Sequence, residues 1–195
     1  MPQPYKPQDS WVEKARQAGF RARSVYKLAE LDKKYRLLKP GRLVLDLGAA
    51  PGGWLQYIAQ KIGEQGRALG IDLKEIAFVA DNVLTRVGDI SDRAWLEGEL
   101  AQLNWDKFDL IVSDAMPNTT GVKEVDSGKS LELSRLVFQL AKDKLKPKGS
   151  LVMKVFEGED LKDFLTELKN HFALVAKERV QPTRSRSREL YLVCR

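Results

Sequence analysis

The fold is decided by the stretch Leu43-Val44-Leu45-Asp46-Leu47-Gly48-Ala49-Ala50-Pro51-Gly52-Gly53-Trp54. It passes from an apolar strand pattern through a glycine-rich turn into a helical pattern. Glycines lack a Cβ atom, so the backbone of the turn can bend tightly and lie close against a ligand. The helix that follows presents free N–H groups to polar or anionic ligand atoms. The stretch therefore predicts a ligand-binding loop between a strand and a helix.

Further strand and helix patterns alternate along the chain. Apolar runs typical of buried strands occupy residues 43–47, 68–71, 108–112, 150–155 and 190–193, with weaker candidates at 83–87 and 172–176. Helical patterns cover residues 10–18, 23–35, 53–62, 92–103, 128–145 and 159–169. This alternation, with continuous apolar runs, predicts an α/β fold with a doubly wound, mostly parallel sheet of about seven strands and helices on both faces. We expect the last strand to be antiparallel to its neighbours.

Length and composition favour one globular domain. The chain has 195 residues, of which 43% are hydrophobic and 31% are charged, which suffices for a core and is not typical of a disordered chain. We therefore expect a single domain over residues 1–195. Within it, residues 1–38 are expected to form a basic helical extension that contributes to the active site, and residues 39–195 the cofactor-binding and catalytic core.

Cysteine and histidine usage excludes two classes of site. Cys194 is the only cysteine and His171 the only histidine, so neither an intramolecular disulfide nor a Cys/His zinc cluster can be assembled. The N-terminus has no apolar segment of the kind that a secretory signal needs, and no run approaches the roughly 20 apolar residues of a membrane span. We expect a cytoplasmic, monomeric protein without a metal or a membrane partner.

The glycine-rich loop does not match the dinucleotide-binding pattern G-x-G-x-x-G. Ala49 and Ala50 follow Gly48, and Ala50 takes the place of the second glycine. The loop resembles instead motif I of the class I methyltransferases. The resemblance implies a Rossmann-like methyltransferase fold and a loop that wraps the methionine end of S-adenosylmethionine. The cofactor-binding residues that it implies are Asp46, Gly48, Pro51, Gly52, Gly53 and Trp54.

Two more acidic residues end the next two strand candidates. A carboxylate at Asp72 can accept both ribose hydroxyls of an adenosine, and Asp89 can accept from an adenine amino group. The alternative is an ordinary glycine turn with Asp72 and Asp89 as turn or cap residues. Because acids end three successive strands on the ligand side, counting Asp46, the pattern favours the cofactor interpretation.

Two residues further along the chain have the character of catalytic groups. Asp114 lies where the strand pattern 108–112 gives way to a turn, and Lys154 lies late in a strongly apolar strand. A lysine there is costly unless it is paired or exposed. A lysine amine can accept a proton during group transfer. Nearby carboxylates would instead stabilise the ammonium form, and the sequence leaves open which effect prevails.

Five segments together resemble the successive signatures of the FtsJ/RlmE ribose methyltransferases, and they span nearly the whole chain. They are residues 24–28 (SVYKL), 46–54 (DLGAAPGGW), 113–114 (SD), 153–156 (MKVF) and 187–191 (SRELY). The resemblance implies 2′-O-methylation of RNA with a catalytic tetrad of Lys27, Asp114, Lys154 and Glu189, in which Asp114 also borders the cofactor. Lys154 would accept the proton of the ribose hydroxyl or orient its oxygen. Taken alone, Lys27 and Glu189 would ordinarily be structural residues.

The charge distribution is suited to a polyanionic partner. Lysine and arginine outnumber aspartate and glutamate by 33 to 27, a net charge of +6, and the basic residues gather toward both ends of the chain. Such residues contact phosphates and give affinity without reading bases. The target nucleotide has to be presented outside a regular helix. The predicted RNA-binding residues are Arg21, Arg23, Arg184, Arg186 and Arg188.

The substrate implied by the resemblance is a uridine of 23S, large-subunit ribosomal RNA, either free or in the assembled large ribosomal subunit. The tRNA anticodon-loop 2′-O-methyltransferases have a similar tetrad and remain an alternative. An NAD-dependent oxidoreductase would share the strand, the turn and the acid, but it would need a pyrophosphate-compatible loop and a substrate domain. A non-catalytic RNA-binding scaffold is the third hypothesis.

Overall fold

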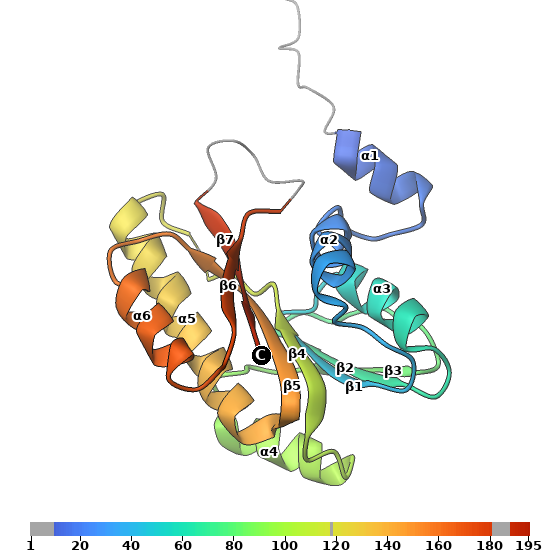
Figure 1. Cartoon of the computed structure of the whole chain (residues 1–195). Coiled ribbons are helices and arrows are strands. Elements are labelled where there is room, and N and C mark those ends of the chain that lie inside the picture. Colours follow the sequence, from blue (N-terminus) through green and yellow to red (C-terminus); the bar gives the residue numbers. More distant parts are fainter. Residues whose placement is uncertain (1–9, 118, 181–187) are drawn as a thin grey trace, which may run out of the picture.

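A computed structural model of the chain describes residues 10–117, 119–180 and 188–195, and seven strands form one sheet in it (Figure 1). The helices are α1 (Ser10–Gln17), α2 (Val25–Tyr35), α3 (Gly53–Ile62), α4 (Arg93–Gln102), α5 (Lys123–Lys144) and α6 (Leu161–Lys169). The strands are β1 (Leu43–Leu47), β2 (Arg67–Asp72), β3 (Val83–Val87), β4 (Phe108–Ser113), β5 (Leu145–Phe156), β6 (Val175–Glu178) and β7 (Glu189–Cys194).

The strand order is β3-β2-β1-β4-β5-β7-β6. Strands β1 to β5 are parallel, and β7 runs antiparallel to both β5 and β6. The predicted doubly wound sheet with an antiparallel last strand is therefore confirmed. The chain proceeds outward from β1 to β3 and then returns to the other side of β1, so the strand order reverses between β1 and β4. Ligands of such sheets bind beyond the carboxyl ends of the strands at this reversal.

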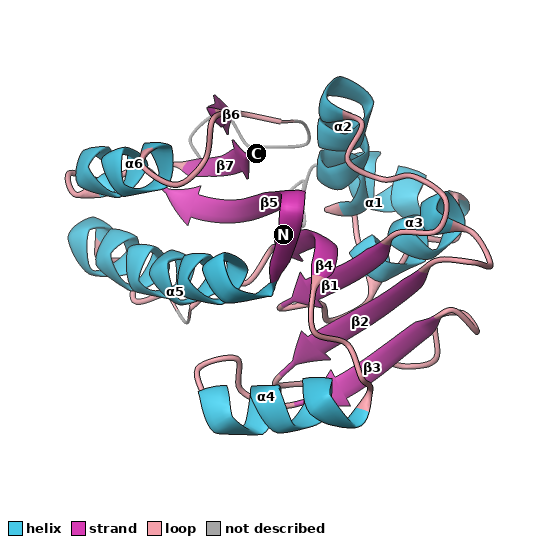
Figure 2. Ribbon diagram, turned by 60° about the horizontal axis from the view of Figure 1, so that its bottom comes forward, coloured by secondary structure: helices cyan, strands magenta, loops and turns pink. Residues whose placement is uncertain are grey.

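Apolar side chains cover both faces of the sheet. Helices α4, α5 and α6 pack on one face, where Phe138 and Phe164 meet at a centroid distance of 6.0 Å. Helices α2 and α3 pack on the opposite face through residues such as Leu28 and Ile58, and Figure 2 shows the two groups of helices on either side of the strands. Because both faces are buried, the central strands have continuous apolar sequences.

Three predicted boundaries are wrong. The strand expected at 150–155 is β5, which already begins at Leu145. Helix α5 begins at Lys123 and not at residue 128, because Asp126 accepts hydrogen bonds from Thr120 N (2.6 Å) and Gly121 N (3.1 Å) and so orders the chain before the first turn. The weak strand predicted at 172–176 is β6, at Val175–Glu178. Phe172 instead closes α6, because its N–H donates to Leu168 O, and its ring is buried in the core.

Among the described residues, each helix is too short or too polar to cross a membrane. Within the same residues, the His, Cys, Asp and Glu side chains form no group of three or more that could hold a metal ion.

Candidate active site

The loop after β1 brings its backbone close to the rest of the molecule. Gly48 has a φ of 77°, and a Cβ added there would lie 2.5 Å from Ala115 Cβ, so only glycine fits. Gly52 has a φ of 100° and precedes the first turn of α3. The loop therefore turns tightly, as the glycine pattern predicts, and at Gly48 it packs against the turn that follows β4.

Asp46, at the end of β1, has an unusual environment. Its carboxyl group is fully buried, and neither oxygen has a hydrogen-bond partner among the described residues. Burial raises the pKa of this carboxyl well above its ordinary value, and the nearby Asp114 and Asp72 carboxylates add to the shift. Buried polar groups are normally hydrogen-bonded, so Asp46 is suited to a ligand that brings its own donor.

A small cavity connects Asp46 with the turn after β4 and with the N-terminal segment. Its lining comprises Ser24, Asp46, Gly48, Ala49, Ala50, Pro51, Gly53, Trp54 and Asp114. The predicted cofactor loop and one predicted catalytic acid thus border the same space. Asp72 and Asp89 lie outside this lining.

The two other predicted cofactor acids have local partners. Asp72 accepts hydrogen bonds from Ala50 N (2.9 Å) and Lys74 N (2.9 Å). Its carboxylate therefore fixes the backbone of the glycine-rich loop to the end of β2. Asp89 is exposed, and its Oδ1 atom accepts from the N–H and the hydroxyl of Ser91. These hydrogen bonds lower the pKa of Asp89, which keeps its carboxylate charged.

The four residues of the predicted tetrad form two ion pairs. Lys154 Nζ lies 3.1 Å from Asp114 Oδ1 and also donates to the backbone carbonyl of Asp114 at 2.6 Å. Lys27 Nζ is paired with the carboxylate of Glu189. Both lysines are only 8% exposed, so each depends on its acid for compensation of its charge.

Tyr191 joins the two pairs. Its hydroxyl donates to Asp114 Oδ1 at 2.6 Å, and its ring lies 5.5 Å from Lys27 Nζ. Burial raises the pKa of Tyr191 well above its ordinary value, and the Asp114 and Glu189 carboxylates raise it further. The hydroxyl therefore keeps its proton and remains a donor between the two acids.

The pairing of β5 with β7 explains this arrangement. Lys154 is opposite Tyr191, and Phe156 is opposite Glu189. Because side chains alternate along a strand, Lys154, Tyr191 and Glu189 share the face of the sheet that α2 covers. Lys27 on α2 thus pairs with Glu189, which is 162 positions away in the sequence.

The N-terminal segment also contacts the loop after β1. Trp54 Nε1 donates to Ser24 O at 2.8 Å, and the Trp54 ring packs on Tyr191 at a centroid distance of 5.9 Å. A Cβ at Gly53 would lie 3.1 Å from Ala22 Cβ. The segment that carries Lys27 is therefore packed directly on the predicted cofactor loop.

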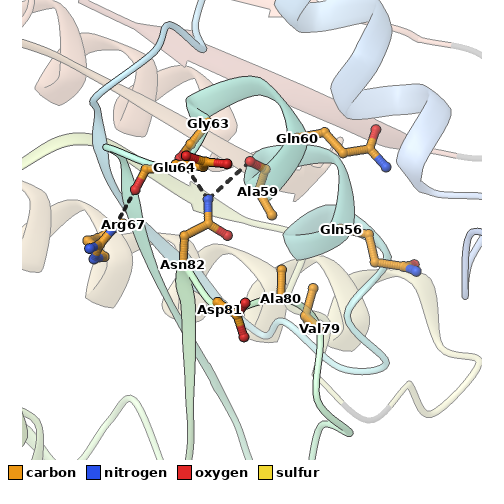
Figure 3. Close-up of a pocket in the computed structure, with 10 residues that line it drawn as sticks. All are labelled: Gln56, Ala59, Gln60, Gly63, Glu64, Arg67, Val79, Ala80, Asp81 and Asn82. Atoms are coloured by element: carbon orange, nitrogen blue, oxygen red, sulfur yellow. Dashed lines mark hydrogen bonds between the residues drawn. The ribbon is translucent and has the colours of Figure 1, made fainter.

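A groove of about 550 Å³ lies elsewhere, along the outer side of α3 (Figure 3). Two of its polar side chains bind backbone carbonyls: Asn82 donates to those of Ala59 and Gly63, and Arg67 donates to those of Glu64 and Gly66. These contacts stabilise the end of α3, and none of the predicted site residues lines the groove.

Comparison with known proteins identifies the family. The FtsJ-like methyltransferase family matches residues 20–195. The chain belongs to this family. It is 41% identical to a ribosomal RNA large subunit methyltransferase E of Hahella chejuensis over 96% of this chain and 90% of the relative. It is 39% identical to the protein of that name in Methanobrevibacter smithii, over the same shares of the two chains.

A solved structure confirms the fold of this FtsJ-like methyltransferase. The crystal structure of a ribosomal RNA methyltransferase from Plasmodium falciparum matches with a TM-score of 0.81 and 32% identity. The match covers 90% of this chain and 97% of the other. The predicted methyltransferase fold and family are therefore confirmed together.

The predicted RNA-binding arginines of this FtsJ-like methyltransferase have different surroundings. Arg188 donates to Lys123 O (3.0 Å) and to Ser127 Oγ (2.8 Å), and so links β7 to the start of α5. Arg23 is half-buried, and the guanidinium of Arg21 binds backbone carbonyls. Arg184 and Arg186 lie outside the described residues. RNA contact by these five residues stays a prediction.

Tyr191 is the site residue that sequence reasoning missed, although it belongs to a quoted signature. The available signal was its position two residues after Glu189, on the same face of an apolar strand. A buried tyrosine hydroxyl usually finds a hydrogen-bond partner, but the sequence does not indicate which acid this partner is.

Proposed function

We propose that this protein transfers a methyl group from S-adenosylmethionine to a ribose 2′-hydroxyl of RNA, and that its target is a uridine of 23S ribosomal RNA. The observation that carries this proposal is the pair of linked ion pairs, Lys154–Asp114 and Lys27–Glu189. Asp114 lines the same cavity as Asp46 and the glycine-rich loop. The names of the relatives support the choice of ribosomal RNA.

The residues around Asp46 fit the proposed methyl donor. Its unpartnered, buried carboxyl group suits a ligand with a hydrogen-bond donor, such as the ammonium group at the methionine end. When bound, S-adenosylmethionine supplies a methyl carbon on a positively charged sulfur, which leaves without an acid catalyst. The proposed cofactor-binding residues are Asp46, Gly48, Pro51, Gly52, Gly53, Trp54, Asp72, Asp89 and Asp114.

Lys154 is the proposed catalytic residue. Two directions around its Nζ atom are taken by the carbonyl and the carboxylate of Asp114. The remaining direction is left for the ribose 2′-hydroxyl, whose oxygen Lys154 would orient or whose proton it would take as the O–C bond forms. Asp114 holds the amine in place, and the Tyr191 hydroxyl in turn holds Asp114.

Lys27 and Glu189 complete the proposed tetrad from the other side of Tyr191. The Lys27 ammonium adds positive charge close to the site, and Glu189 compensates for it. We assign Lys27 to a helical extension of residues 1–38 and the rest of the tetrad to the core of residues 39–195. A ribosomal RNA substrate also implies a cytoplasmic location.

The test is methyl transfer by the Lys154→Ala variant. With labelled S-adenosylmethionine and large ribosomal subunits that lack the modification, we expect the variant to lose about 100-fold or more in rate while it still binds S-adenosylmethionine in calorimetry. Lys146→Ala is the matched control, because Lys146 forms the other lysine–aspartate pair between β5 and β4, with Asp109 at 2.8 Å, at the opposite end of these strands. The control should keep full activity.

Four outcomes would count against the proposal. Undiminished methyl transfer by Lys154→Ala would remove the lysine from the reaction. Tight binding of NAD without binding of S-adenosylmethionine would favour an oxidoreductase. Transfer to a tRNA anticodon loop, without transfer to ribosomal RNA, would keep the chemistry and change the substrate. Wild type that binds RNA and transfers no methyl group would indicate a scaffold.

A further inference from the structure

Arg21 reaches from the segment between α1 and α2 to two other loops. Its Nη1 atom donates to Ala77 O (2.9 Å) and Pro51 O (3.3 Å), and its Nη2 atom donates to Phe78 O. Its backbone N–H donates to Gln56 Oε1 (2.9 Å), and the Gln56 amide donates back to Gly19 O (3.0 Å). One residue therefore joins the N-terminal segment, the glycine-rich loop and the loop that follows β2.

An arginine is well suited to this position. The guanidinium is a planar group with five N–H donors in a fixed geometry, so one side chain can bind several carbonyls at once. Gly52 packs closely against this guanidinium and against Ile76. A Cβ at Gly52 would be 2.9 Å from Arg21 Nη1 and 3.0 Å from Ile76 Cγ2. The guanidinium thus closes the space between Pro51–Gly52 and the loop of residues 76–78.

One of the loops that Arg21 joins lines the proposed cofactor site, and the other follows a strand that ends in a proposed cofactor-binding residue. Pro51 and Gly52 are part of the glycine-rich loop, and residues 76–78 follow Asp72 at the end of β2. Both loops therefore leave the carboxyl ends of adjacent strands, β1 and β2, and this is the edge of such sheets at which ligands bind. A change in Arg21 would remove the hydrogen bonds that its guanidinium makes to both loops and leave the apolar contact of Ile76 with Gly52, which is less directional.

We propose that Arg21 is a positioning residue for S-adenosylmethionine, and that it acts by fixing the loop of residues 76–78 against the glycine-rich loop. This inference rests on the proposed function, since it needs S-adenosylmethionine as the ligand. It gives Arg21 a role different from the phosphate contact expected from its charge. Both terminal nitrogens of its guanidinium are directed to backbone carbonyls and so are engaged within the protein.

The experiment separates cofactor binding from RNA binding. Calorimetry with S-adenosylmethionine should show a Kd about 10-fold higher for Arg21→Ala than for wild type, which corresponds to one lost charge-assisted interaction of about 1.4 kcal/mol. Arg21→Lys should also bind S-adenosylmethionine more weakly, because one ammonium group cannot donate to the carbonyls of both loops in the geometry of the guanidinium. The KM for S-adenosylmethionine should rise in both variants, and the Kd for RNA and its salt dependence should stay at the wild-type values.

Arg67→Ala is the matched control. Arg67 also donates to two backbone carbonyls, those of Glu64 and Gly66, but it does so at the start of β2, away from the glycine-rich loop. This variant should bind S-adenosylmethionine as wild type does. An equal loss of affinity in Arg67→Ala and Arg21→Ala would show a general structural effect and overturn the inference.

Two further results would also overturn it. Arg21→Ala with unchanged affinity for S-adenosylmethionine and a shallower salt dependence of RNA binding would make Arg21 a phosphate contact. Absence of S-adenosylmethionine binding by wild type would refute the proposed function itself, and the inference with it. Because wild type is measured first, the two failures are distinguishable.

Discussion

At the scale of single residues, Asp46 is the clearest case of a group whose position opposes stability. Its folded-state pKa is raised by burial and by the nearby Asp114 and Asp72 carboxylates. Protonated Asp46 is therefore compatible with the fold, and charged Asp46 is not compensated by any described residue. Such a cost at a ligand site is expected when the ligand supplies the missing partner.

The Asp46→Asn variant tests this cost. A carboxyl whose folded pKa is raised contributes stability that is present below its unfolded pKa of about 3.9 and is lost as pH rises through the folded pKa. Asparagine cannot ionise, so it removes this loss. Without ligand, we expect the variant to be more stable than wild type at pH 8, by on the order of 1–3 kcal/mol, and the advantage to shrink toward pH 4.

Thermal unfolding of both proteins across this pH range is the measurement. Wild type and variant share all other titratable groups, so their difference isolates Asp46. An advantage of the variant that grows as the pH falls would contradict the assignment of the raised pKa.

At the scale of elements, the position of α2 decides whether Lys27 reaches the site. Asp32, one turn further along α2, is buried, and it accepts hydrogen bonds from Leu38 N (2.8 Å) and from the Tyr57 hydroxyl of α3 (3.1 Å). Burial raises the pKa of Tyr57, and Asp32 raises it further, so the hydroxyl keeps the proton that it donates. Asp32 therefore fixes α2 against α3 and against the chain that leads to β1.

The Asp32→Ala variant should lose both hydrogen bonds and leave two donors unpaired. Each unpaired buried group costs about 1–3 kcal/mol, and Tyr57 is only half-buried, so its hydroxyl counts at the low end. We therefore expect a loss of roughly 2–4 kcal/mol in the free energy of unfolding, measured with urea, and slower methyl transfer because Lys27 is less well held.

Asp32→Asn is the comparison for this loss, because its amide oxygen can still accept from one of the two donors. It should recover part of the stability. Equal stability of the two variants would show that these hydrogen bonds do not hold α2.

At the scale of the whole molecule, positive charge exceeds negative charge, and part of the excess is in the predicted RNA contacts near both ends of the chain. Strand β7, which follows the last basic run in the sequence, pairs with β5. Helix α2 contacts β7 through the Lys27–Glu189 ion pair. Basic segments from the two ends of the chain therefore both connect directly to elements of the candidate site.

Substitution of Arg184 and Arg186 by alanine tests the predicted phosphate contacts of the last basic run. Each lost contact to single-stranded RNA should reduce the slope of log K against log salt concentration by about 0.7 in magnitude, so two lost contacts should reduce it by about 1.4. RNA binding measured over a range of salt concentrations gives this slope.

The charge-matched control is the pair Lys146→Ala and Lys148→Ala, two exposed residues at the opposite end of β5 from Lys154. Their loss should leave the slope nearly unchanged. A similar reduction in both double variants would mean that only the net charge matters, and that the arginines make no localised contact.

The sequence alone was sufficient for the strand–turn–helix at residues 43–54 and for the order of the elements, and it named four residues that the structure brings together as two ion pairs. These features depend on local patterns: apolar period, glycines where a Cβ does not fit, and signatures of a known family. The start of α5 was misplaced because its signal is a set of hydrogen bonds from Thr120 and Gly121 to Asp126, and such contacts leave no periodic pattern.

Only the tertiary structure decided how distant residues pair. The sequence left open whether Lys154 would be paired, and it did not indicate that Tyr191 connects Asp114 with Lys27. Charge alone suggested a phosphate contact for Arg21, and the fold directs its guanidinium to carbonyls of two loops. The physical reason is that strand register and helix packing bring these groups together across long sequence separations, whereas local sequence patterns carry information over only a few residues.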